Sequence, residues 1–186
     1  MSSPICRTDN SVLVVVDIQQ RLGAAMPSKV LNRVVQNSAL LIRAADELQI
    51  PMVLTEQYPR GLGPTLPEIS CHTPATASRI EKTQFSAMAC DAFVSALRQK
   101  NRSQVILLGM EAHICVLQTA FGLAGNGHSV FVVEDAICSR RLENYQNALD
   151  RMRCGDVNIV SAESVVFEWL GDASHPSFKS IQALLR

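Results

Sequence analysis

The chain has 186 residues, 47% of them hydrophobic, which suits a single globular domain over residues 1–186 that buries a large core. Its 17 basic and 17 acidic residues cancel, so nothing favours nucleic acid as a partner. The longest apolar runs are about five residues, far from the roughly 20 that span a bilayer, and the N-terminus does not resemble a secretion signal. We therefore expect no membrane partner and a cytoplasmic location.

Short runs of Val, Ile and Leu alternate with longer stretches of helical periodicity, a pattern typical of a parallel sheet covered on both faces. The first part of the chain predicts a strand at 11–17, a helix from residue 28 to just before Pro51, a strand at 52–55 and a long irregular loop at 57–77. Loops of that length are usually functional or disordered.

The middle of the chain continues the alternation. A short strand is expected at 79–82, a helix at 87–100, a strand at 104–108 and a helix at 115–124. The last of these helices is followed by a Gly-Asn-Gly sequence that supplies a positive-φ stop. Strand and helix thus keep alternating without a linker between them.

The C-terminal part predicts a strand at 129–133, an amphipathic helix at 142–153, a strand at 157–160 and short helices at 163–170 and 176–185. The sum is an α/β fold with three layers, in which a doubly wound, six-stranded and mainly parallel sheet has helices on both faces. The expected strand order is 3-2-1-4-5-6, which makes the first and fourth strands neighbours at the switch point where ligands bind.

Three residues with catalytic potential lie at or just after the ends of predicted strands. Cys115 begins the helix after the fourth strand, where backbone N–H groups favour a thiolate and would lower the pKa of the thiol. Asp17 ends the first strand and Lys82 the third, so the expected strand order brings all three to one crevice. Each residue taken alone has a simpler explanation. Cys115 could fill space in the core, Asp17 could be a loop or capping residue, and Lys82 could be a solvated residue at the end of a strand.

The remaining cysteines and the histidines suggest no metal site and no cofactor. The histidines show no i, i+4 pairing and no cysteines have C-x-x-C spacing. The cysteines other than Cys115 are expected to be reduced and to act as small apolar or loop residues: Cys6, Cys71, Cys90, Cys138 and Cys154.

Four peptides together resemble the isochorismatase-like cysteine hydrolase superfamily. They are VVDIQ, EKTQFSA, GMEAHICV and VVEDA, at residues 15–19, 81–87, 109–116 and 132–136. Their order and spacing match this superfamily over nearly the whole chain. Two further peptides, TEQYP and GDASHP at 55–59 and 171–176, resemble the compact isochorismatase-domain branch, whose physiological substrates are mostly unassigned.

The resemblance implies a Cys-Asp-Lys triad at Cys115, Asp17 and Lys82 that hydrolyses a small amide or related C–N bond through a thioester, without a cofactor. Asp17 would take the thiol proton and Lys82 would stabilise the thiolate. The resemblance also implies a cis peptide between Met110 and Glu111, which would aim the amides of Glu111 and Cys115 at the oxyanion. It further implies a small-molecule substrate and self-association, with the number of subunits open.

The sequence also differs from some relatives. Nicotinamidases often carry a metal-binding histidine in the segment that reads TEQYP here, so metal-assisted nicotinamide binding is not expected. The candidates to line the substrate pocket are Gln19, Gln57 and Phe85. Each has an alternative that explains it equally well: a polar position at the sheet edge for Gln19, a loop contact for Gln57 and a core ring for Phe85.

Two other functions stay open. The fold could be a catalytically relict binding or scaffold protein that works by self-association, or a thiol-based redox sensor. A sensor needs neither an Asp nor a Lys beside its thiol and usually has a resolving Cys nearby, so the combination of residues favours hydrolysis.

Overall fold

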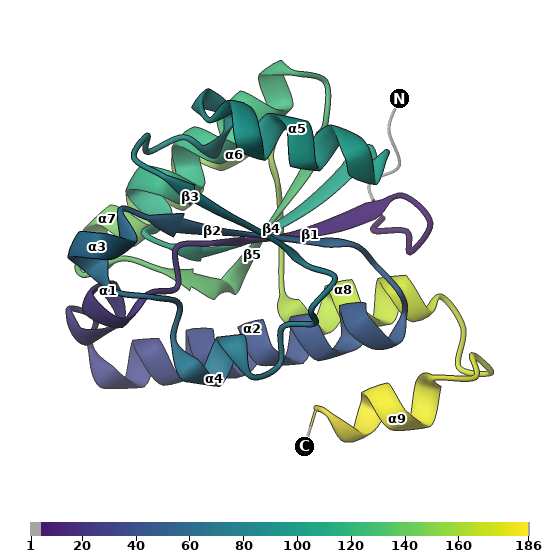
Figure 1. The fold of residues 1–186 in the computed structure, drawn as a ribbon. Helices are drawn as coiled ribbons and strands as arrows, with labels where there is room; N and C mark the ends of the chain where they lie inside the picture. The colour runs from purple at the N-terminus through teal and green to yellow at the C-terminus, as the bar shows by residue number, and fades with distance from the viewer. Residues whose placement is uncertain (1–4, 186) are drawn as a thin grey trace.

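The computed structural model of the chain describes residues 5–185 (Figure 1). Six strands form one sheet in the order β3-β2-β1-β4-β5-β6, which confirms the predicted topology. Every neighbouring pair is parallel, so the described sheet is parallel throughout rather than mainly so. The strands are β1 (Ser11–Val16), β2 (Met52–Gln57), β3 (Ser78–Lys82), β4 (Gln104–Met110), β5 (Ser129–Cys138) and β6 (Asn158–Val160).

Helices cover both faces of the sheet, as the pattern predicts, and none of those described is long and apolar enough to cross a bilayer. In Figure 1 one layer lies above the sheet and the other below it. The upper layer contains α5 (Asp91–Lys100), α6 (Leu117–Gly125) and α7 (Leu142–Arg153). The lower layer contains α2 (Ser28–Glu47), α4 (Pro67–Ser70), α8 (Ala162–Leu170) and α9 (Phe178–Ala183).

The core is divided between the two faces of β1. Leu13 and Val15 pack in the cluster between the sheet and helices α2 and α8. Val12, Val14 and Val16 pack in the cluster between the sheet and helices α5 and α6. All five side chains are at most 1% exposed. Because both faces of the strand are buried, its sequence is a continuous apolar run without polar alternation.

The predicted irregular loop at 57–77 is wrong in part, because it contains two short helices. They are α3 (Pro59–Leu62) and α4, and each has a proline in its first turn. Proline has no N–H to lose there and its fixed φ suits a helix start, so the residues that read as breaks also begin helices. A further short helix, α1 (Gln20–Ala24), was not predicted.

Two predicted helices begin differently. The one expected at 87–100 is a 3₁₀ turn, η1 (Ala87–Ala89), followed after Cys90 by α5. The one expected to begin at Cys115 starts earlier, with the π-helical turn η2 (Ala112–Val116), and continues as α6. Cys115 therefore lies within the first turn rather than at its opening. π-helical turns are rare and frequently occur at functional sites.

Candidate active site

Asp17 follows β1 directly and lies at the centre of a buried polar cluster. Its φ of 51° places it in the left-handed region, where Asp is tolerated, and turns the chain sharply at the end of the strand. Its side chain has no exposed surface. The hydroxyl of Thr55, a residue of the neighbouring strand β2 that pairs in register with Val16, donates to Asp17 Oδ1 over 2.6 Å. The carboxylate is thereby oriented by the adjacent strand.

Lys82, the last residue of β3, points its ammonium back across β2 to Asp17. Its Nζ lies 2.7 Å from Asp17 Oδ2 and 2.7 Å from Gln57 Oε1. It also donates to the carbonyl oxygens of Gln84 and Phe85 over 3.2 and 3.4 Å. A buried ammonium needs such partners because its charge has left water, and here each proton has an acceptor.

Cys115 approaches the pair from η2. It is 5% exposed, and Asp17 lies close enough to its thiol to raise the pKa of that thiol. Burial, and after it the charge of Asp17, raises the pKa of Cys115 to about 12, although the charge of Lys82 acts in the opposite direction. The expectation of a lowered thiol pKa is therefore wrong for the resting site. Desolvation outweighs the favourable position at a helix start, and the sulfur rests as a thiol.

The three candidate pocket residues have different surroundings. Gln19 has no exposed surface, and its amide nitrogen donates to the carbonyls of Gln57 and Gly63 while its oxygen accepts from Gln57 N. Gln57 uses its oxygen for Lys82 and its nitrogen for the carbonyl of Thr83. The polar side-chain atoms of both glutamines are therefore used in hydrogen bonds within the protein, and these bonds hold Lys82 and the neighbouring loops in place. Phe85 is 55% exposed, so it is not a core ring and lies at the surface beside Lys82.

The turn between β4 and η2 carries a second buried charge. The Met110–Glu111 peptide bond is cis. The Glu111 carboxylate is 4% exposed and pairs with Arg140, whose Nε lies 3.1 Å from Oε1. Gly109, just before this turn, has a φ of +127°, and a Cβ added there would overlap the backbone of Val16. Glycine therefore lets β4 run close against the end of β1.

Sequence reasoning missed Thr55 and Arg140. Thr55 pairs in register with Val16, so a polar residue beside the end of the first strand was a usable signal. Arg140 gave no such signal, because its contact depends on the path taken by the chain after β5.

A hollow of about 470 Å³ opens beside Lys82. Asp17 and Cys115 are not among its lining residues, which are Tyr58, Pro59, Arg60, Glu81, Lys82, Thr83, Gln84 and Cys90. Lys82 thus links the buried cluster to an opening. Among the residues that the structure describes, no group of three His, Cys, Asp or Glu side chains is arranged to hold a metal ion.

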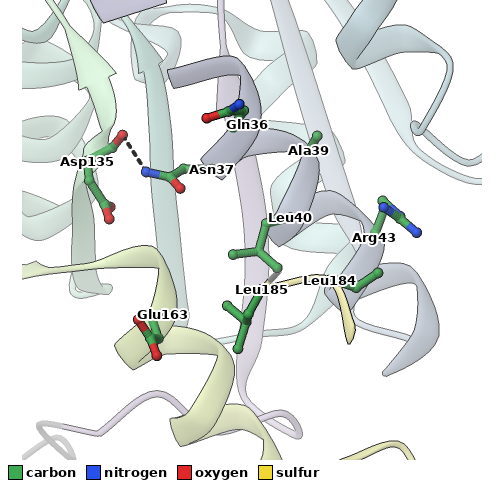
Figure 2. Close-up of a pocket in the computed structure, with 9 residues that line it drawn as sticks. All are labelled: Gln36, Asn37, Ala39, Leu40, Arg43, Asp135, Glu163, Leu184 and Leu185. Atoms are coloured by element: carbon green, nitrogen blue, oxygen red, sulfur yellow. Dashed lines mark hydrogen bonds between the residues drawn. The ribbon is translucent and has the colours of Figure 1, made fainter. Parts of the chain in front are cut away.

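A second hollow of about 470 Å³ lies on the α2 side of the sheet (Figure 2). Asn37 of α2 lines it, and its side-chain amide donates to the carbonyl of Asp135 over 2.9 Å, with Glu163 of α8 nearby. None of its lining residues belongs to the cluster around Cys115. This hollow is therefore a groove where α2, α8 and the residues after α9 meet.

Comparison with known proteins agrees with the fold. The isochorismatase domain matches residues 11–164. Isochorismatase domain-containing protein 2 of Danio rerio is 39% identical over 180 residues, which is 96% of this chain and 88% of that protein. A solved structure described as MAR1 ribonuclease from Caenorhabditis elegans is 34% identical, with a TM-score of 0.91 over 97% of this chain and 92% of that one.

A more distant structure shares the fold alone. It is the Escherichia coli YcaC gene product, described as an octameric hydrolase of unknown specificity, with 23% identity and a TM-score of 0.84 over 98% of this chain and 97% of that one. The family match covers the strands and turns that carry Asp17, Lys82 and Cys115. The chain therefore belongs to the isochorismatase family of hydrolases.

Proposed function

We propose that this chain is a cysteine-dependent hydrolase that cleaves a small amide or related C–N bond. The observation that supports the proposal is the approach of three groups from distant parts of the chain: Asp17 and Lys82 form a buried ion pair, and the charges of both act on the buried thiol of Cys115. Nucleophile, base and cation are the parts that acyl transfer through a thioester requires.

In the first half of the reaction, Asp17 accepts the thiol proton as the Cys115 sulfur attacks the substrate carbonyl carbon. The raised pKa of Cys115 favours this coupled transfer over a resting thiolate, because burial disfavours the free anion. Lys82 stabilises the negative charge that passes between carboxylate and sulfur. The amides of Glu111 and Cys115 would donate to the tetrahedral oxyanion.

In the second half, the protonated Asp17 returns its proton to the leaving nitrogen as the C–N bond breaks. Ammonia or an amine departs and the acyl group stays on Cys115 as a thioester. Water then adds to the thioester while Asp17 accepts its proton. The C–S bond breaks, Asp17 returns the proton to the Cys115 sulfur, and the carboxylic acid leaves.

The decisive experiment incubates the protein with a panel of small carboxamides, ureides and related compounds and measures ammonia or amine release. The wild type should turn over at least one compound, and Cys115→Ala should not. Intact-mass spectrometry of the wild type under turnover should detect the acyl adduct. Full turnover by Cys115→Ala would refute the mechanism. Peroxide-dependent disulfide formation without hydrolysis would favour a redox sensor instead, and neither activity would favour the relict scaffold.

The name of the Caenorhabditis elegans relative makes RNA a substrate worth including in the panel. Nothing in the charge of this chain favours RNA, because its net charge is zero and the buried Asp17–Lys82 pair is neutral as a unit. The hollow beside Lys82 is lined by both Arg60 and Glu81, so it presents no single positive field. We therefore favour the small amide. Self-association, which rests on the family resemblance, is tested by the mass of the particle in solution.

A further inference from the structure

The carboxylate of Glu111 is buried beside Cys115 and is held from outside by one residue, Arg140. Arg140 Nε donates to Glu111 Oε1 and Oε2 over 3.1 and 3.2 Å, and the Arg140 backbone N–H donates to Oε2 over 3.0 Å. The Glu111 side chain is 4% exposed, whereas that of Arg140 is 57% exposed. A surface residue thus balances a buried charge.

The backbone of Glu111 organises the turn that carries Cys115. Its carbonyl oxygen accepts from the N–H of Ile114 over 3.0 Å and from the N–H of Val116 over 3.3 Å. These two residues flank Cys115 in sequence. The orientation of Glu111 therefore fixes the orientation of the turn, and its side chain is the point at which Arg140 acts on that turn.

The partner segment is placed by the sheet itself. Met110 of β4 pairs in register with Cys138 of β5, so the residues that follow the two strands leave the sheet side by side. A second link runs in parallel, because His113 Nδ1 lies 2.9 Å from Ser139 Oγ. The segment after β5 therefore braces the turn after β4 at two points, of which Arg140 bears the charge.

We propose that Arg140 is a positioning residue for the hydrolysis: by clamping the Glu111 carboxylate, it holds the Glu111 amide where the oxyanion develops. The inference rests on the proposed function, since that function gives the Glu111 amide its task. Arg140 touches no reacting atom in this role. Oxyanion donors must lie within a narrow range of the developing charge, so a small displacement of the turn lowers the rate without exposing the thiol.

Two probes of the same sulfur separate this role from a general structural one. p-Nitrophenyl acetate acylates Cys115: the sulfur attacks the ester carbonyl, an oxyanion forms, and p-nitrophenolate leaves while the thiol proton passes to Asp17. Iodoacetamide alkylates the sulfur by displacing iodide, with the thiol proton again passing to Asp17, and forms no oxyanion. Acylation of Cys115 therefore depends on the oxyanion donors. Alkylation of Cys115 reports only the access and ionisation of that thiol, and it is read as the difference from Cys115→Ala because Cys71 and Cys154 are exposed thiols as well.

Arg140→Met should slow acylation by roughly tenfold or more while alkylation stays within about twofold of wild type. Arg140→Lys should recover part of the rate, because it restores the charge but not the planar donor. Adding Glu111→Gln to Arg140→Met should cause no further loss, because both changes break one contact. Arg141→Met, which removes the same charge from the neighbouring exposed residue, should behave as wild type.

Equal slowing of both probes in Arg140→Met would show that the whole site has moved and would overturn the proposal, as would unchanged acylation. If Arg140→Met does not fold, Glu111→Gln alone takes its place and must show the same selective loss to a smaller degree. Wild-type acylation no faster than that of Cys115→Ala would refute the proposed function, and this inference with it. Wild-type acylation that persists fully in Arg140→Met would refute this inference alone.

Discussion

Lys82 Nζ lies 2.7 Å from Asp17 Oδ2 across a neighbouring strand, although 65 residues separate the two in sequence. The strand between them, β2, contributes one side-chain hydrogen bond to each side chain: the Thr55 hydroxyl donates to Asp17, and the Gln57 side-chain oxygen accepts from Lys82. Neither side chain of the ion pair is exposed. Buried ion pairs are seldom better for stability than apolar residues, so this one points to chemistry rather than to folding.

Asp17→Asn should abolish hydrolysis and also destabilise the fold, because it leaves the Lys82 ammonium buried without its counter-charge. Removing one partner of a buried pair costs about 3–5 kcal/mol of the free energy of unfolding. Urea denaturation of Asp17→Asn, Lys82→Met and the double variant measures the cost. The double variant should be more stable than either single variant and still inactive. A double variant that shows the simple sum of the two losses would mean that the charges do not interact.

Thr55→Val should reduce the rate of hydrolysis more than a matched change elsewhere. The substitution keeps the shape of the side chain but leaves Asp17 Oδ1 without its donor, at a cost of about 1–3 kcal/mol. Thr119→Val is the control, since its hydroxyl is also buried and accepts from the Ala87 N–H over 2.9 Å. Both variants should lose similar stability, but only Thr55→Val should lose most of its turnover. Equal effects on turnover would remove Thr55 from the active site.

The order of the strands and the approach of Asp17, Lys82 and Cys115 follow from information that the sequence displays. Apolar runs with helical stretches between them require parallel pairing, and right-handed crossovers leave few topologies. Each of the three residues lies at or just past the end of a strand, so the sheet order alone predicts that they meet. The structure has that order and the Asp17–Lys82 ion pair, and the charges of both residues act on the Cys115 thiol.

Other features depend on quantities that residue spacing does not display. The raised pKa of Cys115 results from how completely the finished fold excludes water from the thiol. The contact between Glu111 and Arg140 depends on the path of a loop. The helices that begin at Pro59 and Pro67 were hidden because proline marks both a break and a helix start. Gln19, a candidate pocket residue from the sequence, has no exposed surface and holds the segment 57–77 in place by donating to the Gly63 carbonyl.

Gly109→Ala should be strongly destabilising, because a Cβ there would overlap the backbone oxygen of Val16 and φ is +127°. We expect a loss of about 3 kcal/mol or more, together with loss of activity, since the overlap pushes apart the ends of β1 and β4. Gly125→Ala is the matched control: an added Cβ meets no atom within 4 Å, and alanine should leave stability unchanged or raise it by up to about 1 kcal/mol. Thermal denaturation of the two variants distinguishes them. A mild effect at Gly109 would contradict the close approach of the strands.

The ionisation of Cys115 should make the folded state less stable at alkaline pH. The pKa of this thiol is raised from its ordinary value of 9.0 to about 12, chiefly by burial and then by the charge of Asp17. The unfolded chain therefore loses this proton at a lower pH than the folded chain does. The contribution to stability is fully present below pH 9 and is lost as the pH rises from 9 towards 12, with a slope of up to about 1.4 kcal/mol per pH unit.

Urea denaturation between pH 8 and about 10.5 tests this linkage when wild type and Cys115→Ala are compared. The small cavity in the variant lowers its stability by the same amount at every pH, so the diagnostic quantity is the difference in slope. Stability should fall more steeply with pH in the wild type than in Cys115→Ala. Cys154→Ala, which removes an exposed thiol, should keep the wild-type slope. Identical slopes for wild type and Cys115→Ala would mean that water reaches the sulfur freely, and Asp17 would then have no shielded proton to take.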